Sequence, residues 1–237
     1  MHKDGGVVMK YNDETSTNAL LVMWKATALG NIIAFNEACE YILSHLHDII
    51  NPDYFLAYAY LAGSYYDLNE WNDSLNYYLK VVETNPNYFY AYEEIAILLY
   101  HDKNYKDSIK YFQKASEYSD SYSYTLMSAA CYYKLGDSIS AKKLLQAKMK
   151  KLTANTTEYD LVRFFNDNYS RNAEVTLKQK IQKESNSNNR GKMLFYLGLY
   201  YEINNADDVA KEYYAEVTSL QAPMFFEYRI AEWGLEG

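Results

Sequence analysis

Few side chains in this sequence have the type and spacing that chemistry requires, and each of them has a more ordinary explanation. His45 and His47 are two residues apart, so on a helix they point in different directions and cannot bind one metal ion. Cys39 and Cys131 stand in helical runs, where a cysteine packs as a small apolar residue. The sequence therefore predicts no metal site and no reactive thiol.

Paired carboxylates and phosphate-binding loops, two other common signs of catalysis, give no stronger signal. Glu93 and Glu94 are adjacent, as are Asp207 and Asp208, so the carboxylates of each pair diverge on a helix. A solvated face or a helix N-terminus explains them. The sequence contains no Gly-rich phosphate loop and no Gly-x-Ser-x-Gly motif. We therefore predict a protein that is not an enzyme and that uses no cofactor.

The composition predicts a soluble helical protein that does not bind nucleic acid. The 23 Lys and Arg residues are outnumbered by 31 Asp and Glu residues, and the net charge of -8 disfavours contact with phosphates. Hydrophobic residues make up 49% of the 237 residues, which excludes extended disorder. Only 9 Gly and 3 Pro are available for turns, too few for a many-stranded fold. The unusual feature is the 28 Tyr, against 9 Phe and 3 Trp.

A repeat organises most of the chain. Pro52 and Pro86 are 34 residues apart, and each follows an apolar helical run. Small residues recur at two positions of this period, where they allow the two helices of a unit to approach closely. They are Ala62, Ala96, Ala129 and Gly198 in the first helix, and Ser74, Ser108, Ala141 and Ala210 in the second. Together with the surrounding aromatic residues, this pattern resembles the tetratricopeptide repeat (TPR), which implies an all-α, TPR-type helix-turn-helix solenoid.

The repeat predicts one solenoid domain at 15–237 after a flexible leader at 1–14. We expect units at about 19–52, 55–86, 89–120, 122–151 and 191–222, an irregular helical insertion at 152–190, and a capping helix at 224–235. The first helices of the units are expected at about 17–30, 54–68, 88–101, 122–135 and 192–204. Three residues depart from the pattern: Lys25 stands at a normally apolar position of the first unit, Asp120 replaces a proline, and Lys148 replaces a small residue.

The TPR resemblance also implies a binding groove, because certain first-helix positions line the concave face of such a solenoid. Tyrosine recurs at these positions, and its rigid ring with one hydroxyl group suits contact with a peptide. The candidate groove residues are Tyr66, Asp67, Tyr90, Glu93, Ile97, Tyr100, His101, Tyr133 and Lys134. Asp67 and Glu93 favour a peptide with basic or neutral side chains. The alternative is a general enrichment of tyrosine on a helical surface.

The second half of the chain carries a closer resemblance. Its residues are Phe-Tyr-Leu-Gly-Leu-Tyr-Tyr at 195–201, Ala210, Leu-Val-x-Phe-Phe at 161–165, and Phe-Glu-Tyr-Arg at 226–229. Over about residues 120–235 the chain resembles the NlpI-type bacterial outer-membrane lipoproteins. That resemblance implies a dimeric periplasmic scaffold without a catalytic site, which gathers cell-wall hydrolases and a processing protease. The chain departs from this family in lacking a signal peptide and a lipid-attachment cysteine, so we do not transfer the partners.

The leading hypothesis is a non-enzymatic scaffold or adaptor that binds a partner protein or peptide in the tyrosine-rich groove. One alternative is an NlpI-like adaptor for cell-wall hydrolases and a protease. Another is a periplasmic protein that binds a small molecule. A scaffold predicts an open groove, whereas a ligand carrier predicts a closed pocket of several hundred cubic ångströms.

The compartment and the oligomeric state are predicted from the N-terminal part. As written, the chain has no signal peptide and no transmembrane segment, which predicts a cytoplasmic protein. A longer precursor would instead predict a periplasmic protein or a lipoprotein. The N-terminal unit carries more apolar surface than one neighbour can cover, which predicts a homodimer through that unit. The residues concerned are Leu20, Leu21, Met23, Trp24, Ile32 and Ile33.

Overall fold

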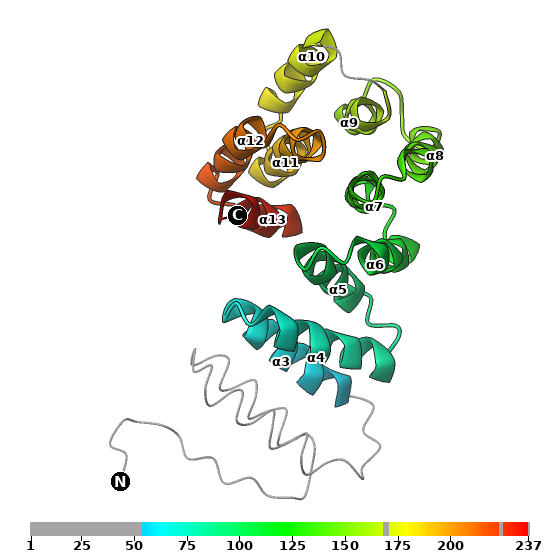
Figure 1. Cartoon of the computed structure of the whole chain (residues 1–237), viewed down its shortest axis with the longest axis vertical. Coiled ribbons are helices and arrows are strands. Elements are labelled where there is room, and N and C mark those ends of the chain that lie inside the picture. The colour runs from blue at the N-terminus through cyan, green and yellow to red at the C-terminus, as the bar shows by residue number, and fades with distance from the viewer. Residues whose placement is uncertain (1–53, 168–170, 223–224, 237) are drawn as a thin grey trace, which may run out of the picture. The chain divides into compact units, whose positions relative to one another are not determined.

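The computed structural model describes residues 54–167, 171–222 and 225–236 (Figure 1). Within these ranges all regular secondary structure is α-helical, which confirms the predicted fold class. The helices are α3 (Tyr54–Asp67), α4 (Trp71–Thr84), α5 (Tyr90–His101), α6 (Tyr105–Tyr118), α7 (Tyr122–Lys134), α8 (Ser138–Met149), α9 (Thr157–Asn166), α10 (Arg171–Gln182), α11 (Ser187–Ile203), α12 (Asp207–Ser219) and α13 (Phe226–Glu236).

Helices α3, α5, α7 and α11 occupy the positions predicted for the first helices of four units. Helix α11 begins at Ser187, inside the range expected to be irregular. The reason is local: the Asn186 side chain accepts a hydrogen bond from the amide of Asn189 and so caps the helix earlier. The predicted unit at 19–52, its apolar dimer surface, His45, His47 and Cys39 all lie outside the described residues.

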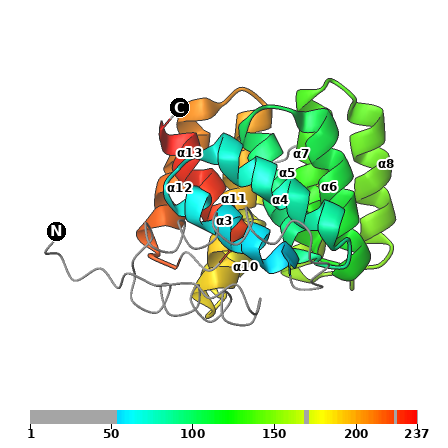
Figure 2. The ribbon, with the colours of Figure 1, turned by 90° about the horizontal axis from the view of Figure 1, so that it is seen from below.

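The chain divides into two compact units, and the division falls within α5. The first unit ends at Ile95 and the second begins at Ala96. In the first unit, α3 packs against α4. In the second unit, every helix from α6 to α13 packs against the next one in the chain. Figures 1 and 2 both show α8 beside α7 in this second unit.

The turn that joins the two helices of a repeat is built in the same way four times. A residue just after the first helix has a left-handed backbone, and the next amide donates to a carbonyl in the last helical turn, as in a Schellman motif. The left-handed residues are Asn69, Lys103, Gly136 and Asn205, with φ of 61°, 60°, 78° and 60°. The four amide-to-carbonyl distances, from Glu70, Asn104, Asp137 and Ala206, are all 2.9 Å. This recurrence identifies α3–α4, α5–α6, α7–α8 and α11–α12 as copies of one repeat.

The small residues of the repeat lie where the paired helices meet. The Ser74 hydroxyl donates a 2.8 Å hydrogen bond to the carbonyl of Ala62, and the Ser108 hydroxyl donates an equivalent 2.8 Å bond to Ala96. Both serines are fully buried. A serine at this position therefore permits close approach and also links the two helices by a hydrogen bond, because it reaches a main-chain oxygen that has a second lone pair.

The second unit folds back on itself through its C-terminal helices. Helix α11 packs against α7 and α9 as well as α12, and α13 packs against α11 and α12. Figure 1 shows α8 on one side of α7, and α11 and α13 on the other. Glu227 of α13 is fully buried and accepts hydrogen bonds from the hydroxyls of Ser123 (2.5 Å) and Tyr196 (2.8 Å). The chain's own C-terminal part thus covers the face of α7 that carries Ser123.

None of the helices in the described ranges combines the length and the apolar character that crossing a bilayer requires.

Candidate functional site

In the first unit, four predicted groove residues lie at or near helix surfaces. Tyr90, the first residue of α5, is 63% exposed. Asp67 is exposed, whereas Tyr66 and Glu93 are partly buried. The ring of Tyr66 meets that of Trp71 edge to face, with centroids 5.3 Å apart. Tyr90 is therefore the most accessible aromatic ring of the four positions.

Tyr90 belongs to an aromatic cluster, which we define as Phe55, Tyr88, Phe89 and Tyr90. The centroid distances are 4.1 Å for Phe89–Tyr90, 5.8 Å for Tyr88–Tyr90 and 5.1 Å for Phe55–Tyr88. Phe89 is 39% exposed. The cluster thus presents rigid ring surface to solvent, and its rings already hold one another in place.

Carboxylates accompany these rings on α3 and α5. Burial and, to a smaller extent, the negative charges of Glu93 and Asp67 together raise the pKa of Glu94 to about 7. Burial, with the charge of Glu94 next in importance, also raises the pKa of the Tyr78 hydroxyl. Glu93 and Asp67 therefore lie close enough to Glu94 for their charges to disfavour its ionisation.

In the second unit, the predicted groove residues are buried or partly buried, and Tyr133 and His101 contact other helices of that unit. Ile97 is 1% exposed and Tyr100 is 7% exposed, whereas the groove prediction expected accessible side chains. The Tyr133 hydroxyl donates to the carbonyl of Phe165 in α9 at 2.9 Å. The imidazole of His101 lies 4.4 Å, centroid to centroid, from the indole of Trp233 in α13. These contacts arise because α9, α11 and α13 pack back toward α7.

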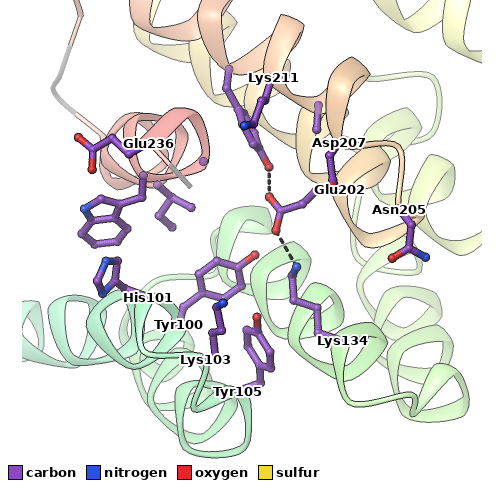
Figure 3. Close-up of a pocket in the computed structure, with 15 residues that line it drawn as sticks. Tyr100, His101, Lys103, Tyr105, Lys134, Glu202, Asn205, Asp207, Lys211 and Glu236 are labelled. Atoms are coloured by element: carbon purple, nitrogen blue, oxygen red, sulfur yellow. Dashed lines mark hydrogen bonds and ion pairs between the residues drawn. The ribbon is translucent and has the colours of Figure 1, made fainter.

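An open cavity of about 720 Å³ lies within the second unit (Figure 3). Three predicted groove residues line it: Tyr100, His101 and Lys134. Figure 3 shows Tyr100 and Tyr105 reaching in from one side and Glu202 and Lys211 from the other. The remaining lining residues are Lys103, Asn205, Asp207, Ala210, Tyr214, Ile230, Trp233, Gly234 and Glu236.

A charged network crosses this cavity. Lys134 forms a 2.6 Å ion pair with Glu202, and the Tyr214 hydroxyl donates a 2.5 Å hydrogen bond to the other oxygen of that carboxylate. Burial raises the pKa of the Tyr100 hydroxyl well above its ordinary value, and the charge of Glu202 adds to the shift. Among the described residues, the buried Tyr100 hydroxyl has no hydrogen-bond partner. The cavity thus contains a neutral donor, the hydroxyl of Tyr100, that has no acceptor among the described residues.

A second cavity in this unit, of about 480 Å³, contains the predicted groove residue Tyr133. Its other lining residues include Asn166, Asp167 and Asn204. The Asp167 carboxylate is already engaged by Arg163 at 2.8 Å, which lowers the pKa of Asp167. The Asn166 amide donates to the Asp167 carboxylate at 2.9 Å, whereas its own buried Oδ1 has no hydrogen-bond partner among the described residues. This cavity is smaller than the first, so it is the weaker candidate for a binding site.

The sequence analysis missed Glu202, although a signal was available. The amides of Asn69, Lys103, Gly136 and Asn205 donate to the carbonyls of Tyr66, Tyr100, Tyr133 and Glu202, which are equivalent positions of the repeat. The groove positions of the earlier units, continued into the last unit, include Glu202. Trp233 carries no such signal, because α13 follows the last repeat.

The described residues offer little for catalysis or metal binding. No group of three or more His, Cys, Asp or Glu side chains in the described ranges could hold a metal ion. Cys131 is buried, and burial raises the pKa of its thiol to about 12. A thiol with so high a pKa carries almost no reactive thiolate at neutral pH.

Comparisons with known proteins identify the fold of the chain but not a family to which it belongs. No family model matches the chain, and no curated protein matches it in sequence. A TPR protein from Parabacteroides merdae ATCC 43184 matches in structure with a TM-score of 0.58 at 9% identity, over 92% of this chain and 98% of that chain. The MamA protein matches with a TM-score of 0.51 at 15% identity, over 89% of this chain and 93% of that chain. The fold is that of a TPR solenoid, and these comparisons do not support the NlpI-type resemblance.

Proposed function

We propose that this protein is a non-enzymatic scaffold whose first unit binds a cationic segment of a partner protein. The TPR fold supports a role in protein–protein interaction, because stacked helix pairs present extended faces for a partner. The binding surface in this proposal comprises Tyr66, Asp67, Tyr90, Glu93 and Glu94, together with the aromatic cluster. An NlpI-like adaptor role is not part of the proposal.

The observation that carries the proposal is the exposure of Tyr90 beside a group of carboxylates. An exposed ring fixed by neighbouring rings contributes contact area without a large loss of side-chain freedom. Asp67, Glu93 and Glu94 add a negative potential, which attracts lysine and arginine side chains and repels acidic ones. The same rings provide faces for cation–π contacts with those side chains.

The test is a fluorescence-anisotropy titration with two short labelled peptides. One repeats lysine, serine and leucine, and the other replaces every lysine with glutamate. We expect the protein to bind the lysine peptide only, with an affinity that falls as salt is added. Tyr90→Ala should weaken binding at least about fivefold. It should change the free energy of unfolding by less than about 0.5 kcal/mol, because the ring is exposed.

Matched variants separate this surface from the general negative charge of the protein. Asp67→Asn combined with Glu93→Gln should weaken binding of the lysine peptide. Glu117→Gln combined with Glu216→Gln removes the same charge from exposed positions of the second unit and should leave binding nearly unchanged. Equal effects of the two double variants, or unchanged binding by Tyr90→Ala, would contradict the proposal.

A further inference from the structure

The 720 Å³ cavity of the second unit is separate from the surface proposed above, because its lining residues all come from the second unit. Its volume falls within the range of about 300–1,000 Å³ that is usual for small-molecule pockets. Its lining comes from four separate parts of the chain, namely α5–α6, α7, α11–α12 and α13. Such a site depends on the tertiary fold of the unit and is already formed.

The strongest sign of a ligand is the hydroxyl group of Tyr100. Tyr100 is 7% exposed and lines the cavity, yet its hydroxyl has no partner among the described residues. A buried hydroxyl without a hydrogen bond costs about 1–3 kcal/mol, so native proteins rarely keep one without a reason. A ligand oxygen that accepts from this hydroxyl would remove the cost.

The charges of the lining indicate a neutral ligand. Three lysines and three carboxylates line the cavity: Lys103, Lys134 and Lys211, with Glu202, Asp207 and Glu236. Lys134 and Glu202 form an ion pair with each other. Within the described residues, the side chains of Lys103, Asp207 and Lys211 have no hydrogen bond or ion pair, and the same holds for Asn205 and Glu236. The lining therefore offers both donors and acceptors, with no net charge to attract an ion.

One wall of the cavity is aromatic and apolar. Trp233 and His101 lie with their rings 4.4 Å apart, and Ile230 stands on the same helix as Trp233. Figure 3 shows His101 on the side of the cavity away from Glu202 and Lys134. A ligand that fits both walls needs a ring with an apolar face, and hydroxyl groups that both donate and accept along its edge.

We propose that this cavity binds a neutral sugar, whose ring lies against Trp233 and one of whose oxygens accepts a hydrogen bond from Tyr100. An anionic ligand would face Glu202, Asp207 and Glu236, and a cationic ligand would face the three lysines. A purely apolar ligand would leave the hydroxyl of Tyr100 and the charged groups without partners. Hydroxyl groups both donate and accept hydrogen bonds. A neutral ring that carries several hydroxyl groups therefore fits the donors and acceptors of the lining, its lack of net charge and its aromatic wall.

The test uses the full chain labelled with ¹⁵N and follows the indole N–H signals of its tryptophans by NMR. The probes are glucose, galactose, maltose and cellobiose, with glucuronate and glucosamine as charged analogues. We expect at least one neutral sugar to shift the Trp233 signal saturably at millimolar concentration, while the signal of Trp71, in the first unit, stays in place. The charged analogues should bind more weakly, and Trp233→Phe identifies the signal.

Tyr100→Phe tests the role of the hydroxyl. The variant should raise the dissociation constant for the sugar about tenfold, the usual effect of one lost hydrogen bond. It should unfold no more easily than the unchanged protein, because the lost hydroxyl had no partner. Tyr118→Phe, at an exposed position of α6 outside the cavity, is the control and should bind sugar normally. No saturable shift with any neutral sugar, tighter binding of a charged analogue, or normal binding by Tyr100→Phe would overturn the proposal.

Discussion

The ammonium group of Lys148 donates hydrogen bonds to Oδ1 of Asp120 at 2.8 Å and to the main-chain carbonyl of the same residue at 2.7 Å. These are two of the residues at which the sequence departs from the repeat, and the structure shows that they contact each other. The side chain of Lys148 is 4% exposed and that of Asp120 is 70% exposed. The lysine replaces a small residue of α8 and links that helix to the segment just before α7.

Lys148→Met should destabilise the protein by about 1–3 kcal/mol, because it keeps most of the buried stem and removes both hydrogen bonds. Asp120→Asn keeps the main-chain acceptor and alters only an exposed side chain, so it should cost less than about 1 kcal/mol. Urea denaturation of both variants measures the difference. The assignment fails if Lys148→Met is neutral, or if the two variants lose equal stability.

Gly198 lies where α11 and α12 approach each other closely. We therefore expect that this position does not tolerate the methyl group of an alanine. A Cβ atom there would lie 2.7 Å from a ring carbon of Tyr214, which is 1% exposed, and 3.0 Å from Cβ of Tyr213. Gly198→Ala should therefore cost about 1–3 kcal/mol despite the better helix propensity of alanine. Gly63→Ala is the matched control, because its Cβ would meet only the Tyr78 hydroxyl at 4.0 Å. It should be neutral or stabilise by up to about 1 kcal/mol. Thermal unfolding that ranks the two variants in the opposite order would contradict this packing.

We expect the carboxyl group of Glu227 to make the free energy of unfolding fall as the pH rises. Burial raises the pKa of this carboxyl, and the charge of Lys192 and the hydrogen bonds from Ser123 and Tyr196 offset that rise only in part. Above the ordinary carboxyl pKa, the unfolded chain releases the proton that the folded protein still holds, so the free energy of unfolding decreases until the folded pKa is passed. Glu227→Gln keeps an acceptor for both hydroxyls and cannot ionise. Urea midpoints at about pH 5 and about pH 8 should therefore differ less in this variant than in the unchanged protein.

The control for Glu227 is Glu216→Gln, at an exposed position of α12. This variant should retain the pH dependence of the unchanged protein. A Glu227→Gln protein that loses stability with pH as steeply as the unchanged protein would show that another group titrates.

We expect the ionisation of Glu94 to strengthen binding of the lysine peptide as the pH rises. Its pKa of about 7 means that the carboxyl is mostly protonated at about pH 6 and mostly ionised at about pH 8. The added negative charge should attract the lysine peptide more strongly at the higher pH. Anisotropy titrations at both values should show this increase in the unchanged protein and a smaller one in Glu94→Gln. An increase of the same size in both proteins would remove Glu94 from the proposed surface.

The repeat itself could be predicted from the sequence, because the repeat is local. Ala62 and Ser74 are 12 residues apart, as are Ala96 and Ser108, and each pair meets within one helical hairpin. Contacts between residues so close in the sequence follow from helix periodicity and turn chemistry. The all-α class and the first helices of four units could therefore be predicted from the sequence alone. The left-handed residues Asn69, Lys103, Gly136 and Asn205 repeat for the same reason.

The tertiary structure alone decided which groove positions are open. Tyr90 and Tyr100 look alike in the sequence, yet Tyr90 is 63% exposed and Tyr100 is 7% exposed. The cavity that Tyr100 lines also contains Trp233, a residue from a helix that lies outside the repeat. Ser123 and Glu227 are 104 residues apart, and no periodic pattern specifies a contact over that separation. Repeat spacing determines which residues share a face, whereas the packing of distant helices determines whether that face meets solvent or the rest of the chain.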